Sequence, residues 1–306
     1  MRVLVVARCK NGRYAPFITE QVIALQELGV ECRVFPVNKS GIEGYLQHLS
    51  GLKRAISAFR PDLIHAHYGL SGLLANLQRK VPVVTTYHGS DINDRKVRPL
   101  SRLSIYLSAF NIFVSQKTLK IISPNDKYAL IPCGINLDDY PEMNKNQARL
   151  QMHLSATGKY VLFSGAFDNA VKNASLAKEA VSHLKSVKLI EMKGYSRAEV
   201  AALMYAADAL LMTSLTEGSP QVIKEALACG CPIVSVDVGD VKELTGGVSG
   251  CFMVERDAES IANALQSVLV SGRRTEGRQI IEEKGLSNDV IARRVLDVYR
   301  EIKEKR

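Results

Sequence analysis

Two glutamates, Glu217 and Glu225, stand eight residues apart in the segment E-G-S-P-Q-V-I-K-E (217–225). A β-rich apolar run ends just before this segment, near Thr213, and a helical pattern follows it. Carboxylates accept hydrogen bonds from hydroxyl groups, so a carboxylate near a helix start can hold the two hydroxyls of a ribose. The chemistry that this setting favours is the binding of a ribose together with its phosphates.

The residues between the two glutamates predict the start of the helix. Ser219 is a favoured N-cap, and Pro220 suits the first helical position. Gly218 has no side chain to block the approach of a ligand. The free backbone N–H groups around Gln221 and Val222, together with the positive end of the helix dipole, predict an anion site.

The position of Glu225 follows from helix geometry. At about 1.5 Å of rise per residue, it lies roughly 7–8 Å along the helix from Pro220. A diphosphate at the helix start would therefore bring both hydroxyls of its ribose to this carboxylate. The alternative interpretation is a solvated helix glutamate at 225 and a loop charge at Glu217. The strand before the segment and the helix start within it favour the binding site.

Three histidines follow predicted strands. His88 ends one strand and is followed by Gly-Ser-Asp, so it is a candidate for the reaction site. The alternative is that this segment only caps the next helix, with Asp91 as the N-cap. His65 and His67 are two residues apart and share one face of their strand. Zinc would need further ligands there, and we interpret the pair as structural or acceptor-side residues.

The cysteines do not form a zinc-ribbon pattern or a disulfide scaffold. Cys229 and Cys231 make a C-x-C pair beside a turn, but other ligands are not near them in the sequence. This usage predicts a reducing, cytoplasmic compartment. The six positions are Cys9, Cys32, Cys133, Cys229, Cys231 and Cys251.

The elements that position these residues alternate along the chain. Strand-then-helix alternation predicts parallel sheets covered by helices on both faces, with ligand loops at the carboxyl ends of the strands. Predicted strands cover 3–7, 32–36, 63–66, 81–87, 112–114, 129–131, 160–164, 187–190, 209–213, 232–236 and 250–254. Predicted helices cover 17–28, 42–59, 179–184, 197–207, 220–228 and 257–269.

The length of 306 residues predicts two domains. A polar break over 136–157 precedes a fresh apolar strand at Tyr160, so we place one domain at 1–150 and another at 151–286. Residues 287–306 form a terminal helix with an apolar stripe that must pack on something. The stripe comprises Val290, Ile291, Val295, Val298, Tyr299 and Ile302.

The composition is that of an ordinary globular protein, with 46% hydrophobic and 23% charged residues. A net charge of +9 favours anionic partners. No apolar run reaches the 18 or so residues of a membrane span, and the apolar start at 3–7 is too short for a signal peptide.

A basic stretch accompanies apolar residues between Lys80 and Lys127. It is either an amphipathic helix with a solvated basic side or a contact for anionic lipid or a lipid-linked acceptor. Peripheral contact with the inner membrane face is the corresponding expectation. Nucleic acid is not expected, because the sequence has neither a recognition motif nor an aromatic platform. The residues concerned are Arg95, Lys96, Arg98 and Arg102 beside Leu100, Leu103, Ile105, Tyr106 and Leu107.

The segment 217–225 resembles the E-x7-E motif of retaining, nucleotide-sugar-dependent glycosyltransferases of family 4. The resemblance extends over nearly the whole chain. It implies the GT-B fold, in which two Rossmann-like domains face a cleft and the last helix crosses back to the N-terminal domain. Supporting pieces are R-P-D-L-I-H-A-H-Y (60–68), V-V-T-T-Y-H-G-S-D (83–91), I-P-C-G-I-N (131–136), S-G-A-F-D-N-A-V-K-N (164–173) and G-D-V-K-E (239–243).

The resemblance also implies roles for single residues. Glu217 would bind hydroxyls of the donor sugar and Glu225 the donor ribose, while the amides of 218–222 would hold the sugar and the phosphates. His88 matches the histidine that faces the donor sugar. The loop with Gly12 and Arg13 would face the donor phosphates and the acceptor. This loop lacks the family's paired glycines, and the absence of G-x-G-x-x-G weighs against a dinucleotide dehydrogenase.

The second domain departs from the family pattern in two places. The family commonly grips the diphosphate with an arginine and a lysine. Here the arginine position is Ala166, while Lys172 matches the lysine. Only one strand, 187–190, lies between that motif and the helix at Arg197, where the family usually has two. The second domain has therefore lost a strand–helix unit near the pocket that binds the base. The sequence does not determine which nucleotide is bound.

The function implied is transfer of a hexosyl unit, with retention, from a nucleotide-diphosphate sugar to a glycan, lipid-linked or small-molecule acceptor. The sequence has no D-x-D motif, so we expect no metal and no cofactor beyond the donor. We expect Glu217, His88 and Lys172 to act in catalysis. One alternative is an epimerase or phosphorylase on the same fold. Another is a non-catalytic nucleotide-sugar-binding subunit of a glycosylation complex.

Overall fold

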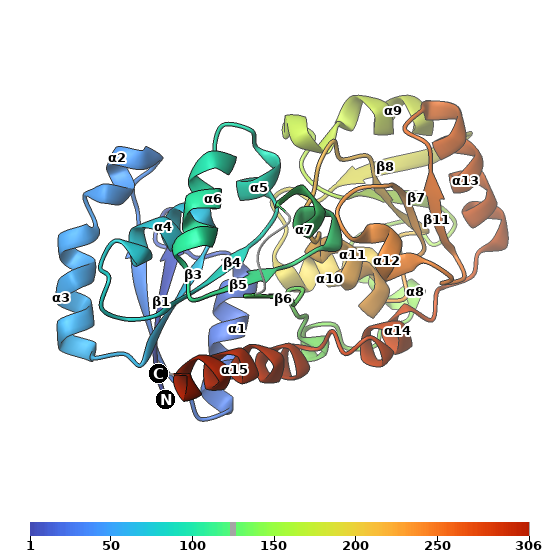
Figure 1. The fold of residues 1–306 in the computed structure, drawn as a ribbon. Coiled ribbons are helices and arrows are strands. Elements are labelled where there is room, and N and C mark those ends of the chain that lie inside the picture. Colours follow the sequence, from blue (N-terminus) through green and yellow to red (C-terminus); the bar gives the residue numbers. More distant parts are fainter. Residues whose placement is uncertain (123–126, 306) are drawn as a thin grey trace. The chain divides into compact units, whose positions relative to one another are not determined.

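The computed structural model describes residues 1–122 and 127–305. The chain divides into two compact units, of which the first comprises Met1–Gly134 with Leu286–Arg306 and the second Ile135–Gly285. Each unit is an α/β layer structure with one parallel sheet (Figure 1). Arg306, the last residue of the predicted terminal helix, lies outside the described residues.

The first unit has a six-stranded sheet in the order β2-β1-β3-β4-β5-β6, with parallel pairing throughout. Its central strands β3 and β4 are buried on both faces, as expected of a parallel sheet covered on both sides. The strands are β1 (Arg2–Arg8), β2 (Glu31–Val37), β3 (Leu63–His67), β4 (Val83–Tyr87), β5 (Phe110–Phe113) and β6 (Tyr128–Leu130). The helices are α1 (Pro16–Glu27), α2 (Gly41–Leu46), α3 (Leu49–Phe59), α4 (Gly69–Asn76), α5 (Ser90–Asn93), α6 (Arg98–Leu107), α7 (Gln116–Ile122) and α15 (Asn288–Glu304).

The second unit has a five-stranded parallel sheet in the order β11-β10-β9-β7-β8. Strand β8 is the only one between β7 and α10, as the sequence predicts, and it forms the edge of the sheet. The strands are β7 (Lys159–Phe163), β8 (Val187–Glu191), β9 (Ala209–Met212), β10 (Ile233–Val236) and β11 (Cys251–Val254). The helices are α8 (Lys145–Gln151), α9 (Ala174–Ser182), α10 (Arg197–Ala206), α11 (Gln221–Ala228), α12 (Val241–Thr245), α13 (Ala258–Ser271) and α14 (Gly277–Glu283), with short 3-10 turns η1 (Leu137–Asp139) and η2 (Ala170–Lys172).

Each of the eleven predicted strands is present, with ends shifted by one or two residues. The predicted helix over 42–59 is wrong, because the structure has two helices, α2 and α3, separated at Gln47 and His48. The His48 ring explains the break. Its Nδ1 lies 2.8 Å from the carbonyl oxygen of Gly44 and its Nε2 lies 2.8 Å from Oδ1 of Asn38, so it closes the end of α2.

The predicted boundary at residue 150 also differs from the structure, where residues 135–150 belong to the second unit. Helix α8 packs against α10. The guanidinium of Arg149 is buried there, donating to the Ala206 carbonyl at 3.1 Å and to both carboxylate oxygens of Asp208 at 3.2 Å. A buried guanidinium needs such partners. The polar composition of this stretch, interpreted as a linker, instead reflects an anchoring contact.

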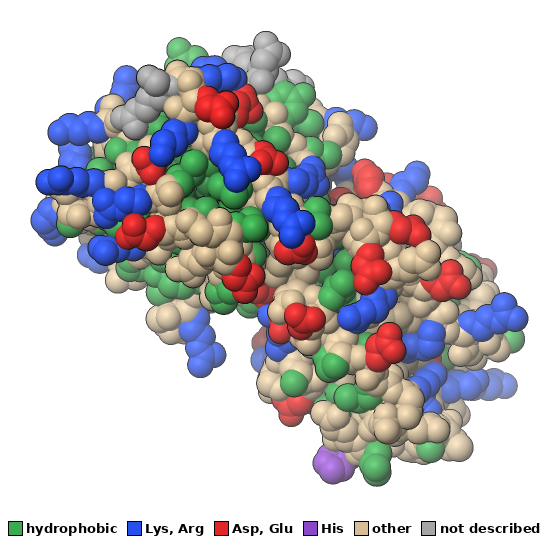
Figure 2. All heavy atoms as spheres, turned by 90° about the horizontal axis from the view of Figure 1, so that it is seen from below, with side chains coloured by type: hydrophobic (Ala, Val, Ile, Leu, Met, Phe, Trp, Pro, Cys, Tyr) green, Lys and Arg blue, Asp and Glu red, His purple; other side chains and the backbone are tan. Residues whose placement is uncertain are grey.

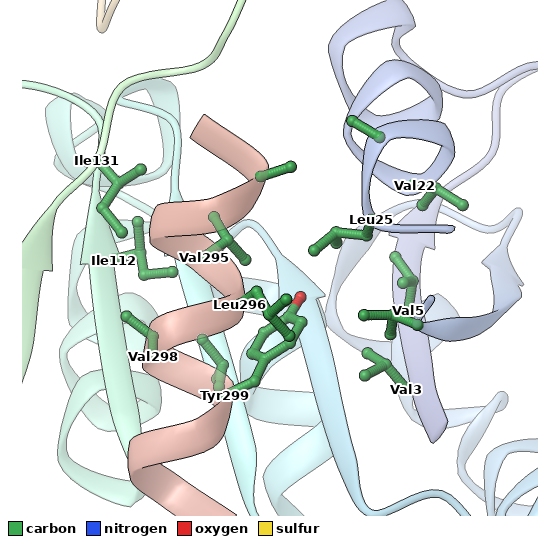
Figure 3. Close-up of a cluster of buried hydrophobic side chains, with 14 of the residues drawn as sticks. Val3, Val5, Val22, Leu25, Ile112, Ile131, Val295, Leu296, Val298 and Tyr299 are labelled. Atoms are coloured by element: carbon green, nitrogen blue, oxygen red, sulfur yellow. The ribbon is translucent and has the colours of Figure 1, made fainter. Parts of the chain in front are cut away.

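Helix α15 belongs to the first unit, where it lies beside α1 and covers one face of the sheet (Figure 1). Figure 3 shows Val295, Leu296 and Tyr299 of this helix turned toward Val3, Leu25 and neighbouring side chains. Five of the six predicted stripe residues, all but Val290, belong to this packed cluster. The Tyr299 hydroxyl also makes a hydrogen bond with Nδ1 of the buried His65, at 2.5 Å.

Candidate active site

Lys172 and Glu217 form an ion pair at the carboxyl edge of the second sheet. Nζ of Lys172 donates to Oε1 of Glu217 at 2.7 Å, and the two side chains are only 19% and 17% exposed. Lys172 ends the turn η2 after β7, and Glu217 lies in the loop between β9 and α11. The two loops meet because β7 and β9 are neighbours in the sheet. Ligand loops of parallel sheets collect at this edge.

The loop that carries Lys172 is held by hydrogen bonds from the residues that follow β9. Oγ1 of Thr213 donates to the carbonyls of Lys172 and Asn173 at 2.9 Å each, and the Leu215 N–H donates to the Val171 carbonyl at 2.8 Å. The stem of Lys172 lies over Gly165, where an added Cβ would come within 2.9 Å of Cγ of the lysine. Any side chain at 165 would displace the lysine.

The helix start differs from the prediction at Ser219. Helix α11 begins at Gln221, Pro220 takes the N-cap position, and Ser219 lies outside the helix. The Ser219 hydroxyl donates to Oδ2 of Asp240 at 2.6 Å. A hydrogen bond from a hydroxyl to a carboxylate is charge-assisted and strong, and this bond turns Ser219 toward Asp240.

The loop that follows β10 packs against residues 218–222. An added Cβ at Gly239 would lie 2.5 Å from the Gly218 carbonyl oxygen. Gly239 also has a positive φ of 54°. Both this backbone conformation and the close approach of Gly218 require a glycine at position 239. The segment before α11 is therefore held in place by its neighbour.

Glu225 lies in α11 as predicted and is half-buried. Its neighbour is Tyr140, in the segment that the sequence placed in the other domain. Burial raises the pKa of Tyr140, and the negative charge of Glu225 raises it further. A buried phenol beside the carboxylate leaves less room for the Glu225 side chain to move.

His88, in the first unit, contacts two side chains through its ring nitrogens. Nε2 lies 3.0 Å from Nδ1 of His67, and Nδ1 lies 3.6 Å from Sγ of Cys133. The rings of Phe17 and Tyr68 lie 4.7 and 4.6 Å away, centroid to centroid. Burial lowers the pKa of His67 to about 3, so this neighbour is neutral.

Asp91 is not the N-cap of the following helix, which was the alternative interpretation of this segment; Gly89 takes that position. Its carboxylate instead accepts from the backbone N–H groups of His88, Gly89 and Gly69 at 3.0–3.1 Å. Burial raises the pKa of Asp91 to about 6, against the lowering by these N–H groups. Asp91 thus fixes the backbone that carries the His88 ring.

The loop with Gly12 and Arg13 is a tight hairpin. The backbones of Lys10 and Arg13 exchange two hydrogen bonds at 2.9 and 3.0 Å. Asn11 and Gly12 both have positive φ, which a type I′ turn requires. Gly12 is thus explained by the turn itself. Arg13, Lys10 and Arg8 line a pocket of about 870 Å³ in the first unit, together with Tyr14, Tyr45, Tyr68 and Asp94.

Within each unit, the structure brings part of the predicted set together. Lys172, Glu217 and Glu225 lie at one edge of the second sheet, with residues 218–222 between the two glutamates. His88 and the loop of Gly12 and Arg13 belong to the first unit.

Four residues at these sites were missed by sequence reasoning. They are Lys224, Asp240 and Tyr140 in the second unit and, as a contact of His88, Cys133 in the first. Lys224 follows Ile223 on the apolar face of α11 and is fully buried. A charged residue in that position was the available signal.

Among the residues that the structure describes, no group of three or more His, Cys, Asp or Glu side chains is arranged to hold a metal ion. Cys229 and Cys231 are both buried, and burial raises the pKa of each thiol. Within the same residues, no helix is long and apolar enough to cross a membrane.

Two family models match the chain. The model described as Glycosyltransferase Family 4 matches residues 2–139, and the model described as Glycosyl transferases group 1 matches residues 173–271. D-inositol 3-phosphate glycosyltransferase of Mycobacterium marinum is 25% identical over 282 residues, covering 74% of this chain and 60% of that protein. TuaC of Bacillus subtilis, named as a teichuronic acid biosynthesis glycosyltransferase, is 26% identical over 238 residues, with 67% and 60% covered. The chain thus spans about 60% of the length of these relatives.

Solved structures share the fold. A sucrose-phosphate synthase from Thermosynechococcus elongatus has a TM-score of 0.87 at 18% identity, with 100% of both chains covered. HepE of Anabaena, solved in complex with UDP and glucose, has a TM-score of 0.76 at 16% identity, covering 98% of this chain and 100% of that one. The chain has the GT-B fold, and both family models that match it are models of glycosyltransferases. It resembles the glycosyltransferases of family 4.

Proposed function

We propose that this chain transfers a hexosyl unit from a nucleotide-diphosphate sugar to an acceptor hydroxyl, with retention at the anomeric carbon and without a metal ion. In this reaction the bond between the anomeric carbon and the diphosphate oxygen breaks, a bond to the acceptor oxygen forms, and the proton of the acceptor hydroxyl passes to the leaving diphosphate. Negative charge builds on the leaving diphosphate. A cation and helix N–H groups that face this charge stabilise the transition state.

One observation carries the proposal. The Lys172–Glu217 pair, at 2.7 Å, stands before α11, with Glu225 in the fifth position of that helix. Lys172 would meet the diphosphate together with the amides of Gln221 and Val222, while Glu217 would bind sugar hydroxyls. The lysine ammonium is a compact charge suited to phosphate oxygens. Glu225 would accept hydrogen bonds from the ribose.

His88 has a place in the same proposal. It would face the donor sugar, as the resemblance implies, with its backbone fixed by Asp91 and its ring by His67. Gly12 and Arg13 would lie on the side of the phosphates and the acceptor. Arg13 lines the pocket that also holds Lys10 and Arg8.

The acceptor belongs to the first unit in this proposal. The pocket is lined by three basic residues, Arg8, Lys10 and Arg13, against two acidic ones, Asp91 and Asp94, and this excess of positive charge suits an anionic group. Its tyrosines suit a sugar ring or an apolar stem. We propose a glycan, lipid-linked or small-molecule acceptor that carries negative charge there.

Helix α6 supports peripheral contact with a membrane. Its Leu103 and Tyr106 are exposed, Tyr106 at 80%, beside the basic Arg102. Apolar and basic side chains together favour an anionic lipid surface. Elsewhere the charges are mixed, and Figure 2 shows basic and acidic side chains interspersed over one face. Co-sedimentation with vesicles rich in anionic lipid, reduced by Tyr106→Ser, is the expected result.

The proposed activity is tested by turnover of UDP-, GDP- and ADP-hexoses with a panel of sugar, sugar-phosphate and lipid-linked acceptors. We expect one donor to release its nucleoside diphosphate only when an acceptor is present. The product's anomeric configuration, measured by NMR, should equal that of the donor. Inversion would overturn the retaining mechanism.

The same assay separates the two alternatives. Turnover of the donor alone, or with phosphate as acceptor, would favour an epimerase or phosphorylase. Tight nucleotide binding without turnover on any acceptor would favour a non-catalytic subunit, an outcome to which Ala166 lends weight because it removes the family's second phosphate-binding cation.

A further inference from the structure

Four polar side chains at the start of α11 form a group that we call the Lys224 cluster: the buried Lys224 and Asp240 and the half-buried Ser219 and Gln221. Lys224 is fully buried, and its Nζ donates to Oγ of Ser219 and to Oε1 of Gln221, both at 2.9 Å. Ser219 in turn donates to Oδ2 of Asp240 at 2.6 Å. The cluster joins α11, the segment before it and the start of α12.

The charges in this cluster balance. Asp240 is buried, which raises the pKa of its carboxyl, and the positive charge of Lys224 lowers it again. The Ser219 hydroxyl bridges the two charged groups, donating to Asp240 and accepting from Lys224. Ser219 and Gln221 therefore direct their side chains inward, toward Lys224.

Stability does not explain the burial of these two charged groups. Burying charges costs desolvation energy, and apolar residues of similar volume are often as stabilising. The two buried charges lie beside residues 218–222, the segment whose backbone we expect to bind the donor. Gly239, the neighbour of Asp240, also touches the Gly218 carbonyl from the same side.

From these contacts we infer that Lys224 and Asp240 are positioning residues for the sugar nucleotide. The cluster holds residues 218–221 so that their backbone N–H groups are arranged for the donor sugar before it binds. Preorganised donors avoid the cost of ordering the loop at each turnover. Neither residue touches the donor; both act through Ser219 and Gln221. The identity of the ligand in this inference rests on the proposed function. The ordering of residues 218–221 by the cluster does not depend on it.

The test uses the double variant Lys224→Met/Asp240→Asn, which removes both charges and keeps the volumes. The single variant Lys224→Met would leave Asp240 buried without its counter-charge and is expected to unfold at lower temperature. The double variant should melt within a few degrees of the wild type. The matched control is Lys242→Met, an exposed lysine on α12.

Two readouts decide the question. Hydrogen exchange followed by mass spectrometry should show faster exchange, by about tenfold or more, over 216–223 in the double variant alone. With the donor that the wild type turns over among UDP-, GDP- and ADP-hexoses, kcat/KM should fall at least about tenfold, and the affinity for the nucleoside diphosphate, which uses only the amides of Gln221 and Val222 in this segment, should fall less.

A double variant with wild-type exchange over 216–223 and wild-type kcat/KM overturns the inference. Equal losses of sugar-nucleotide and nucleoside diphosphate affinity also overturn it, because they would indicate general damage to α11. If the wild type turns over no donor, the proposed function fails, and the exchange measurement still decides whether the cluster orders the loop.

Discussion

At the scale of residues, the pairing of Lys172 with Glu217 is the central feature. In the absence of a donor the two groups neutralise each other across 2.7 Å in a largely buried setting. A diphosphate would compete for the lysine and release Glu217 to accept from sugar hydroxyls. The types and spacing of these residues were predictable from the sequence, but the pairing was not, because η2 and the loop before α11 lie far apart in the chain. Ser219 was misinterpreted as a helix cap because the sequence does not show Asp240 beside it.

Replacing Lys172 by alanine should lower kcat by roughly two to three orders of magnitude, comparable to the loss of one oxyanion donor. Glu217 would lose its partner, so the free energy of unfolding should fall by about 1–3 kcal/mol. Rates should therefore be measured well below the melting temperature. The matched control is Lys188→Ala, an exposed lysine on β8, which should be neutral.

The same variant offers a rescue. Adding Ala166→Arg to Lys172→Ala restores the arginine of the family pattern and should recover part of the lost turnover through a bidentate phosphate contact. Near-normal turnover in Lys172→Ala itself would refute the role of the lysine and direct attention to Arg13 and Lys10.

At the scale of elements, periodicity predicted the strands well, because buried parallel strands are short apolar runs. Periodicity did not predict the break between α2 and α3, which the His48 side chain causes by its contact with the Gly44 carbonyl. The terminal stripe was predictable, since a 17-residue helix with one apolar face must be covered. The hydrogen bond between Tyr299 of this helix and His65 was not predictable, because the two residues are 234 positions apart.

Truncating the packed face of α15 should weaken the first unit. Val295 is fully buried in the cluster of Figure 3, and Val295→Ala should lower the free energy of unfolding by about 1.5–3 kcal/mol from lost burial and the cavity. Urea unfolding followed by circular dichroism measures this loss. Arg300→Ala, on the exposed side of the helix, should change it by less than about 0.5 kcal/mol. Equal effects of the two substitutions would show that the stripe does not pack as described.

We expect the two buried histidines of β3 to make the free energy of unfolding depend on pH. Burial lowers the pKa of His67 to about 3 and that of His65 well below its usual range. The unfolded chain binds protons at both rings below about pH 6.5 and the folded chain does not, so these groups destabilise the fold as pH falls. Asp91 opposes them, because its pKa is raised to about 6 and the folded state takes up its proton first.

The net result should be a loss of about 1 kcal/mol of unfolding free energy per pH unit between pH 6 and 5, measured by urea titration. His67→Asn should make this slope markedly shallower, because one of the two buried rings is gone. A slope that is flat, or that rises toward acid, would contradict the neutral, buried state of the two histidines.

At the scale of the whole molecule, the chain is two α/β units whose sequence order is interrupted, since α15 returns to the first unit. Fold class and unit number were predictable from strand–helix alternation and length. The boundary was not, because the polar side chains of residues 135–150 are used for buried anchoring by Arg149. Polarity alone does not distinguish a linker from such a contact.

Transfer should survive removal of metal ions. If helix N–H groups and Lys172 neutralise the diphosphate, excess EDTA should leave the initial rate largely unchanged in the assay of donor turnover. Buffer treated with a chelating resin serves as the second condition. Complete loss of activity in EDTA, restored by magnesium or manganese, would overturn metal independence and require a cation at the diphosphate.

The most direct test of the account is calorimetric titration of wild type, Glu225→Ala and Glu217→Ala with UDP, GDP and ADP. One nucleoside diphosphate should bind the wild type. Loss of the ribose hydrogen bonds, about 1.5–3 kcal/mol for a charged acceptor, should weaken its binding to Glu225→Ala roughly ten- to hundred-fold. Glu217→Ala should bind it as the wild type does, because Glu217 is assigned to the sugar. Equal affinity of wild type and Glu225→Ala, or no binding of any of the three, would contradict the donor site at α11.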